Sequence, residues 1–199
     1  YLLMVRPAGC EVSQLDYFSV LPAYRSSGVG AKLLVLHLWN GLVSDSNFGA
    51  NLRAYGRLAD MAAEHGLTLT VENVVCNQST PAAHLKELAE EYPHIPFTFD
   101  TKMAEFHGEL DKVYDEKLWT DNIRHLHIND YGGGVKDWSD LRTLHFGEGH
   151  VDFERFFAFE RKMGYSGDFT VEASSVRDDG SVDIDKLNRD FLIIKGHIA

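Results

Sequence analysis

The chain has 199 residues, 44% of them hydrophobic and 25% charged, which is the composition of a globular domain and not of a disordered chain. Its 30 acidic residues exceed its 19 basic residues, so the net charge is −11, and no block of basic residues occurs. This charge disfavours a phosphate-backbone partner, and no nucleic-acid partner is expected.

The sequence shows neither membrane nor secretion signals. No apolar run approaches the roughly 18 residues that span a bilayer, and the start lacks a signal-peptide pattern. The two cysteines, Cys10 and Cys76, are far apart and outside any C-x-x-C arrangement, which indicates neither a disulfide framework nor a cysteine zinc site. We therefore expect a soluble, cytoplasmic protein without a membrane partner, and a homo-oligomer stays open.

Seven short apolar stretches predict β-strands, because nearly continuous hydrophobicity is typical of parallel strands that are covered on both faces. In chain order they are residues 1–7, 31–39, 67–75, 95–100, 123–130, a short stretch at 144–146, and 168–174.

Helical periodicity predicts helices between these strands. One helix covers residues 51–65 and stops at Gly66, which suits the position after a helix end. The next helix opens at residues 79–81, where Pro81 is tolerated in the first turn. The stretch 13–26 is less regular, because a proline interrupts it.

Two further helices follow in the second half of the chain. The first begins at Asp152 and ends at Gly164, with an inward stripe of Phe153, Phe156, Phe157, Glu160 and Met163. The second covers residues 183–195, with Leu187, Phe191 and Ile194 expected to face inward. Such stripes indicate a protein core more often than a ligand site.

Strands that alternate with helices indicate parallel βαβ units, hence a doubly wound sheet or a (β/α)8 barrel. No nucleotide-binding glycine motif follows any strand, and the "GGG" at residues 132–134 is only a weak phosphate-loop candidate. Polar residues instead follow successive strands: His37, Glu72, Asp100, His127 and Glu172. In a barrel these strand ends converge on one face, so we predict a single α/β (β/α)8 TIM-barrel domain over residues 1–199.

Three carboxylates and one imidazole at converging strand ends predict a metal site. Glu72, Asp100 and Glu172 would repel one another unless a cation lay among them. Any one of these residues alone is explained as well by a structural role; Asp100, for example, suits the cap of the helix that follows it. His125 and His127 share one face of a strand, and periodicity does not choose between them.

The order of the motifs "VENV", "FTFDTK", "HLHINDY", "HFGEGHVDFERFF" and "GYSGDFTVEAS" resembles the xylose isomerase-like TIM-barrel superfamily. This superfamily includes sugar isomerases and epimerases, inosose dehydratases and endonuclease IV. The resemblance runs from about residue 32 to residue 174, and "HLHIND" with "GEGHVDF" is specific for the superfamily but not for one activity. It implies metal ligation by Glu72, Asp100, His127 and Glu172, and it favours His127 because this residue is the histidine of an H-x-N-D pattern.

The resemblance also implies a metal-dependent isomerase or epimerase that acts on a sugar or polyol-derived carbonyl compound through an enediolate. Glu72 and Glu172 would be the acid and base that move the proton, while Asp100 and His127 would remain ligands. One divalent ion is expected, Mn²⁺ or Mg²⁺, with Co²⁺ or Zn²⁺ as alternatives. Candidate substrate contacts, for each of which a structural role is an equal alternative, are His37, Trp39, Lys102 and His107.

Several positions depart from the patterns of the superfamily. Met103 stands where endonuclease IV-like members and many epimerases carry a histidine, and Arg6 stands where the former carry another. Residues 141–143 read Leu-Arg-Thr in place of Asp-x-His, and Lys136 is the base nearest to an expected arginine. These departures argue against a three-zinc phosphodiesterase and leave the substrate open.

Three other functions therefore stay as alternatives. A dehydratase of a related keto-polyol would use the same metal and base to expel a hydroxyl group. An endonuclease IV-like phosphodiesterase would need a nucleic acid that the net charge disfavours. A degenerate barrel that only binds a ligand would fit the losses at Arg6 and Met103.

The number of strands predicts an incomplete barrel. A (β/α)8 domain typically needs about 250 residues, and the resemblance places the strand over residues 1–7 as the second strand of the family. We therefore expect the first strand and helix to lie upstream of this sequence, or another segment to fill the gap, because two open parallel edges are rarely tolerated.

Overall fold

The computed structural model describes residues 32–39 and 44–198. The chain forms two compact units, Tyr1–Thr98 and Phe99–Ala199, called the first and the second unit below. Among the described residues, no helix is both long enough and apolar enough to cross a membrane.

Some predictions concern residues outside the described ranges. They are the strand over residues 1–7, the stretch 13–26, and the single residues Arg6 and Cys10. The single domain over residues 1–199 stays a prediction. The boundary between the two units falls inside one strand, β3 (Phe97–Asp100).

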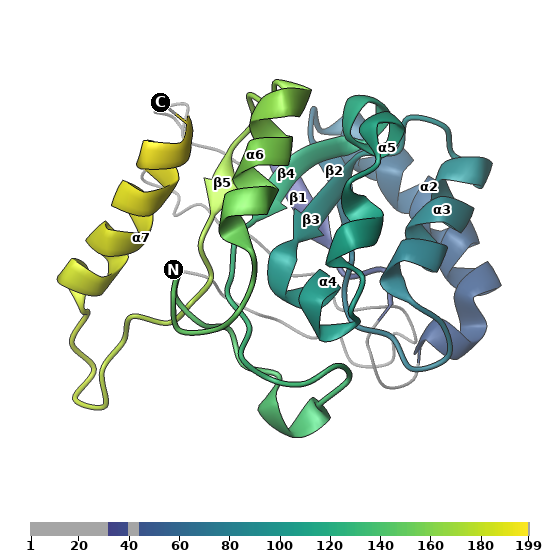
Figure 1. Cartoon of the computed structure of the whole chain (residues 1–199). Coiled ribbons are helices and arrows are strands. Elements are labelled where there is room, and N and C mark those ends of the chain that lie inside the picture. The colour runs from purple at the N-terminus through teal and green to yellow at the C-terminus, as the bar shows by residue number, and fades with distance from the viewer. Residues whose placement is uncertain (1–31, 40–43, 199) are drawn as a thin grey trace. The chain divides into compact units, whose positions relative to one another are not determined.

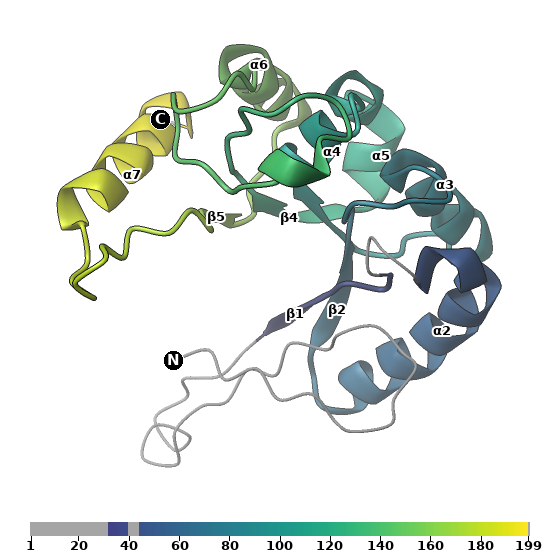
Figure 2. The same ribbon diagram turned by 90° about the horizontal axis from the view of Figure 1, so that it is seen from below.

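In the first unit, parallel strands alternate with helices. The elements in chain order are β1 (Leu33–Leu36), η1 (Ser44–Asn47), α2 (Phe48–Glu64), β2 (Thr68–Glu72), α3 (Pro81–Glu91) and the start of β3. β1 pairs with β2 from Leu33↔Thr68 to Leu36↔Val71, and β2 pairs with β3 at Glu72↔Thr98. The helices α2 and α3 lie along one side of these strands (Figure 1, Figure 2), as in successive βαβ units.

The helix ends predicted in this unit are confirmed. α2 ends at Glu64, and Gly66 follows with φ 68°, a left-handed conformation that glycine adopts without strain. α3 begins at Pro81, and the side chain of Thr80 accepts a hydrogen bond from the Ala83 N–H at 3.3 Å. The start of α2 is Phe48, three residues before the predicted residue 51.

One close contact joins α2 to the chain just after α3. The Tyr92 hydroxyl donates to the Leu52 carbonyl at 3.0 Å, and its ring meets Tyr55 edge-on at 5.1 Å. A Cβ at Gly56 would lie 2.9 Å from the Tyr92 hydroxyl oxygen, so a larger residue there would displace the Tyr92 side chain. Burial raises the pKa of Tyr55 to about 12. The tyrosine pair thus fixes these helices against each other.

The second unit continues the alternation after the end of β3. Its elements are α4 (Thr101–Phe106), η2 (Leu110–Val113), α5 (Glu116–Asp121), β4 (Ile123–His127), η3 (Trp138–Asp140), α6 (Phe153–Met163), β5 (Phe169–Thr170) and α7 (Ile184–Ile198). β4 and β5 are parallel, with Leu126 opposite Phe169 and His127 opposite Thr170.

The predicted helix between Asp152 and Gly164 is confirmed as α6. The Asp152 carboxylate accepts the Arg155 N–H at 3.0 Å, and Gly164 ends the helix in a left-handed conformation. Phe156 and Phe157 are fully buried, and Phe156 stacks on Phe99 at 6.0 Å between ring centroids. The aromatic stripe of α6 therefore forms the core of this unit, as its spacing indicates.

The predicted short strand at residues 144–146 is wrong. Leu144 forms only an isolated antiparallel bridge with Asp130, and the strand predicted over residues 168–174 shortens to β5. The reason lies in the N–H groups of this segment, since the His145 N–H donates to the Glu148 carboxylate and the Phe146 N–H donates to the Asp190 carboxylate. Backbone donors that bond to side chains do not form a sheet ladder.

The inward face predicted for the last helix is only partly right. In α7, Ile194 is buried, but Phe191 is 53% exposed. The buried face instead passes through Asp190, one turn before Ile194, because the Asp190 carboxylate binds His145. A buried polar contact therefore sets the rotation of this helix, and hydrophobicity alone does not reveal it.

Candidate metal centre

Asp100 ends β3 and begins α4, and its two oxygens have different partners. Oδ1 accepts the Met103 N–H at 2.9 Å, which caps the helix, and Oδ2 accepts from the Asn129 side-chain amide at 2.8 Å. The residue is fully buried. The cap and the candidate ligand are therefore not exclusive interpretations, since each uses its own oxygen.

Asp100, His127 and Glu172 come together in the second unit. His127 Nδ1 lies 3.4 Å from Glu172 Oε1 and 4.0 Å from Asp100 Oδ2, and the three side chains offer one ligand atom each within 4.8 Å of one another. His127 is 5% exposed, whereas the Glu172 side chain is 40% exposed. Two carboxylate oxygens and one imidazole nitrogen in this space fit a divalent cation, which would offset the repulsion between the carboxylates.

Asn129 is a site residue that the sequence analysis missed. Its side-chain NH₂ donates to Asp100 Oδ2 at 2.8 Å and to Glu172 Oε2 at 3.2 Å, and its Oδ1 accepts the Glu172 N–H at 2.8 Å. Its backbone exchanges two further bonds with the Thr101 hydroxyl. One fully buried amide thus orients both candidate carboxylates. The H-x-N-D pattern contained the signal, because this asparagine lies two residues after His127 on the strand's extension.

Asp130 explains why "HLHIND" and "GEGHVDF" occur together. Its carboxylate accepts four backbone N–H groups, those of Tyr131, Gly147, Gly149 and Val151, at 2.8 to 3.0 Å. A Cβ at Gly149 would collide with the Tyr131 carbonyl and with this carboxylate. The second motif is therefore the loop that the aspartate of the first motif holds.

The structure distinguishes the two histidines of β4. His125 Nε2 lies 3.0 Å from the Thr170 hydroxyl, and its ring meets His127 edge-on at 5.1 Å. His127 is the histidine that lies beside both carboxylates. This geometry agrees with the choice of His127 as the candidate ligand.

Lys102 and His107 are mostly buried in the second unit, at 7% and 6% exposed. Lys102 Nζ donates to the Thr143 hydroxyl at 2.8 Å, and the His107 ring lies edge-on to Phe106 at 5.2 Å. Both side chains thus have protein contacts of their own, and their predicted role in substrate binding stays a prediction.

In the first unit, Glu72 ends β2 and is 1% exposed. His37 Nε2 lies 2.7 Å from Glu72 Oε2, and the His37 side chain is 34% exposed. Trp39 is fully buried, and its indole N–H donates to the Val74 carbonyl at 2.8 Å. These contacts suit a core residue, and the predicted role of Trp39 in substrate binding stays a prediction.

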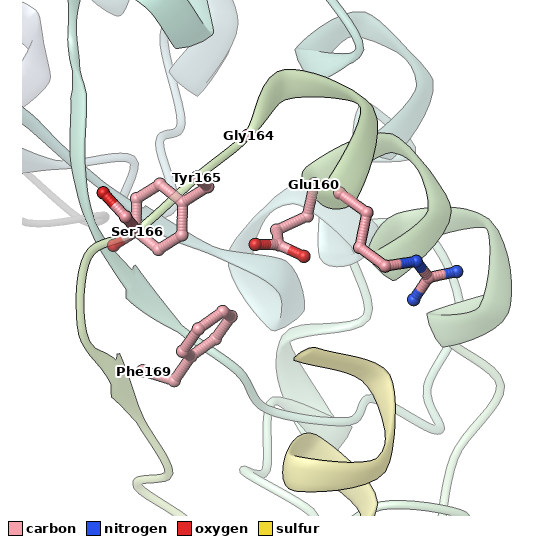
Figure 3. Close-up of a pocket in the computed structure, with 6 residues that line it drawn as sticks. Glu160, Gly164, Tyr165, Ser166 and Phe169 are labelled. Atoms are coloured by element: carbon pink, nitrogen blue, oxygen red, sulfur yellow. The ribbon is translucent and has the colours of Figure 1, made fainter. Parts of the chain in front are cut away.

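A pocket elsewhere in the second unit lies at the other end of β5 from Glu172. It is lined by Glu160, Arg161, Gly164, Tyr165, Ser166 and Phe169 (Figure 3). Burial raises the pKa values of Glu160 and Tyr165 above their ordinary ranges. Because none of the candidate ligands lines this pocket, it is not the candidate centre.

Comparisons with solved structures agree with this fold. A D-tagatose 3-epimerase-like protein matches with a TM-score of 0.63 at 21% identity, over 84% of this chain and 62% of that one. A xylose isomerase domain protein from Alicyclobacillus acidocaldarius matches with a TM-score of 0.65 at 18% identity, over 85% and 64%. The IolI protein with a bound zinc atom matches with a TM-score of 0.65 at 16% identity, over 84% and 63%.

The chain thus spans roughly three fifths of the length of these structures. A comparison with curated proteins gives no significant match. The model of one family, described as xylose isomerase-like TIM barrel, matches residues 26–191. The chain therefore belongs to the xylose isomerase-like TIM-barrel family, whose fold its motifs predict.

Proposed function

We propose that this protein is a divalent-metal-dependent isomerase or epimerase of a sugar or polyol-derived carbonyl compound. The observation that carries the proposal is the meeting of Asp100, His127 and Glu172 around the buried Asn129 amide. Two proteins of similar structure add support, because their names describe sugar epimerases. They are the D-tagatose 3-epimerase-like protein and a D-allulose 3-epimerase from Methylomonas sp. in complex with D-allulose.

Four ligands are proposed: Glu72 and Glu172 also move the proton, whereas Asp100 and His127 act only as ligands. Both are almost completely buried, and Asp100 already uses one oxygen as a helix cap, which leaves it little freedom to move a proton to a substrate. Mn²⁺ or Mg²⁺ suits a set rich in carboxylates. Zn²⁺ is the alternative with a precedent, since the similar IolI structure contains a zinc atom. When bound, the ion supplies stabilisation of negative charge on the substrate oxygens.

Glu172 is the proposed base. Its side chain is 40% exposed, so a substrate can reach it, and the Asn129 amide donates to Oε2. This bond favours a fixed orientation of the carboxylate and leaves Oε1 as the oxygen that takes the proton from the substrate carbon. Asn129 is thus proposed as the positioning residue of the centre.

Glu72 is the proposed fourth ligand and the second acid. The support is the alternation of side chains along each strand. In the first unit, Thr70 and Thr98 share a face, because their hydroxyls are 2.7 Å apart. Glu72 lies two residues after Thr70, and Asp100 two residues after Thr98, so each carboxylate continues that face of its own strand. His37, which contacts Glu72, is then a candidate positioning residue with an accessible side chain.

The test is a panel of ketopentoses, ketohexoses and keto-polyols incubated with the Mn²⁺-loaded protein in deuterated water. We expect an isomer or epimer of unchanged carbon skeleton, with deuterium at the carbon from which Glu172 removes the proton. Loss of water from the product would show the dehydratase instead. Nicking of an abasic duplex in the presence of Zn²⁺, with no sugar turnover, would show the phosphodiesterase. Metal binding without any turnover would favour a barrel that only binds a ligand.

A further inference from the structure

A second group of metal-ligand side chains lies in the first unit and contains none of the candidate ligands discussed above. Asp45 belongs to η1, Cys76 follows β2, and His84 belongs to α3. They are 4%, 0% and 4% exposed, and their ligand atoms lie within 4.8 Å of one another. Three separate elements thus bring a carboxylate, a thiol and an imidazole to one buried point.

The Asp45 carboxylate is fixed on one side. Oδ2 accepts the backbone N–H groups of Asn77 at 3.0 Å and Gln78 at 2.6 Å. Oδ1 is buried and has no hydrogen-bond partner among the described residues. A buried carboxylate oxygen without a donor is unfavourable, and a bound cation would remove this cost.

The His84 ring is held by aromatic neighbours. Phe48 stacks on it at 3.9 Å between centroids, with 20° between the ring planes, and Trp39 lies at 4.8 Å. Its Nε2 lies 4.0 Å from Asp45 Oδ2, which is longer than a hydrogen bond. The two aromatic rings therefore fix the orientation of the imidazole beside the carboxylate.

The Cys76 thiol completes the group. Its Sγ lies 3.5 Å from the Val74 carbonyl, which also accepts the Trp39 indole N–H. Water is kept from the thiol, because Cys76 and Trp39 are both fully buried. The spacing of cysteines in the sequence gave no hint of such a site, since only one of its ligands is a cysteine.

We propose that Asp45, Cys76 and His84 bind a Zn²⁺ ion as three of its ligands. Zinc accepts sulfur, nitrogen and oxygen ligands together, whereas Mg²⁺ and Ca²⁺ prefer oxygen alone. A thiolate, a carboxylate and a divalent ion sum to zero charge, which suits a buried position. Tetrahedral zinc places its ligand atoms roughly 3.5 Å apart, so the side chains need to draw together by only about 1 Å. Binding releases the Cys76 thiol proton to solvent.

Without a metal, the same residues would serve as a buried contact between Asp45 and His84 that holds the turn at residues 77–78. The two interpretations differ at sulfur, because only the metal site uses Cys76 as a thiolate. A sulfur ligand also distinguishes this site from the candidate metal centre, which contains none.

The experiment is a titration of the chelator-treated full chain with Co²⁺, which reports a cobalt–thiolate bond by an intense ultraviolet charge-transfer band. An Asp100→Asn background reduces binding at the candidate metal centre, which is itself spectrally silent in that band. We expect the band to saturate at one equivalent and to disappear on addition of Zn²⁺. It should be lost in Cys76→Ser and kept in the matched control Cys10→Ser, and Zn²⁺ should raise the melting temperature of the control only.

Absence of the band from the folded wild-type protein would overturn the proposal, as would its loss in Cys10→Ser and not in Cys76→Ser. If Cys76→Ser does not fold, Asp45→Asn decides, since its Co²⁺ affinity should fall at least tenfold while an unchanged affinity would also overturn the proposal. A protein that turns over sugars with Mn²⁺ but shows no band would overturn this zinc site alone and leave the proposed function intact.

Discussion

His127 and His145 both lie beside buried carboxylates in the second unit, but their partners differ. His145 Nδ1 is 2.5 Å from Asp190 Oδ2, and its Nε2 is 3.1 Å from the Ser174 carbonyl. His127 Nδ1 faces two carboxylates, those of Glu172 and Asp100, at 3.4 and 4.0 Å, which are contacts longer than hydrogen bonds.

The His145 group resembles a catalytic triad in its composition only. The Ser175 hydroxyl lies 3.4 Å from His145 Nε2, and Asp190 lies beside the other nitrogen. A triad needs an Nε2 that can accept the serine proton. Here the Ser174 carbonyl, which can only accept a hydrogen bond, lies closer to Nε2, so that nitrogen donates. The group is therefore a clamp that joins α7 to the loop after residue 144.

The two groups contain the same residue types, but they differ in their net charge and in the solvent exposure of their carboxylates. One imidazole and one carboxylate, both at most 4% exposed at their side chains, satisfy each other in the clamp. One imidazole between two carboxylates leaves an excess negative charge, and the Glu172 side chain is 40% exposed. We therefore propose a cation and a substrate at the second group and not at the first.

The largest expected effect is on turnover, in Glu172→Gln. This change removes the charge and the proton acceptor but little volume, so the rate on an identified sugar should fall about 10³-fold or more while the fold is kept. Steady-state kinetics and circular dichroism measure the two quantities. Glu154→Gln, at an exposed position of α6, is the matched control and should keep full activity. Near wild-type turnover in Glu172→Gln would mean that another group moves the proton.

The second prediction concerns the clamp, in Asp190→Asn. Loss of the carboxylate that bonds to a buried imidazole should lower the free energy of unfolding by about 2 kcal/mol. The Mn²⁺ affinity of the folded protein should not change, because the clamp has no place for a cation. Urea unfolding and calorimetric titration measure these effects, with the exposed Asp185→Asn on the same helix as control. A loss of Mn²⁺ affinity would remove the distinction between the two groups.

The third prediction concerns the centre, in Asp100→Asn. Asparagine caps helices as well as aspartate does, so the Met103 N–H keeps its partner and the stability should change little. The lost charge should weaken Mn²⁺ binding by about 100-fold, the upper end of the effect of losing an outer partner. An affinity equal to that of the wild type in calorimetric titration would leave Asp100 with its cap role alone.

The sequence predicted those features that depend on local order along the chain. Thr80, Asp152 and Gly164 mark helix ends because caps need only neighbouring backbone groups. Asp100 was proposed as a ligand because parallel strands carry their terminal residues to one edge, whereas the resemblance of the H-x-N-D pattern to the family favoured His127 over His125. In both cases the information lies within a few residues of the feature.

The remaining features depend on partners that are distant in the sequence. Asn129 orients carboxylates that lie 29 and 43 residues away from it. The Phe146 N–H, in a stretch predicted as a strand, donates to the Asp190 carboxylate 44 residues further on. Phe191 is exposed because Asp190 binds His145, 45 residues away. Each outcome follows from a buried polar contact, which periodicity does not encode.

A third buried carboxylate, Glu160, lies in the second unit and has neither a histidine partner nor a proposed cation. Glu160 is 2% exposed, and its Oε2 has no hydrogen-bond partner among the described residues. Burial, opposed in smaller measure by Arg161, raises its pKa above the ordinary carboxyl value. The folded state therefore holds this proton more tightly than the unfolded state does, so stability should fall as the pH rises through and above that value.

Glu160→Gln removes the charge that becomes unfavourable at neutral pH. We expect the variant to gain about 1 kcal/mol in the free energy of unfolding at about pH 7, and the gain to vanish near pH 4, where the wild-type carboxyl group is protonated. Urea unfolding at the two pH values measures the difference, and the exposed Glu154→Gln on the same helix should show no such dependence on pH. A change of equal size at both pH values would mean that packing, and not the buried charge, decides the effect. In that case burial alone would not distinguish this carboxylate from Asp100, which we assign to a cation.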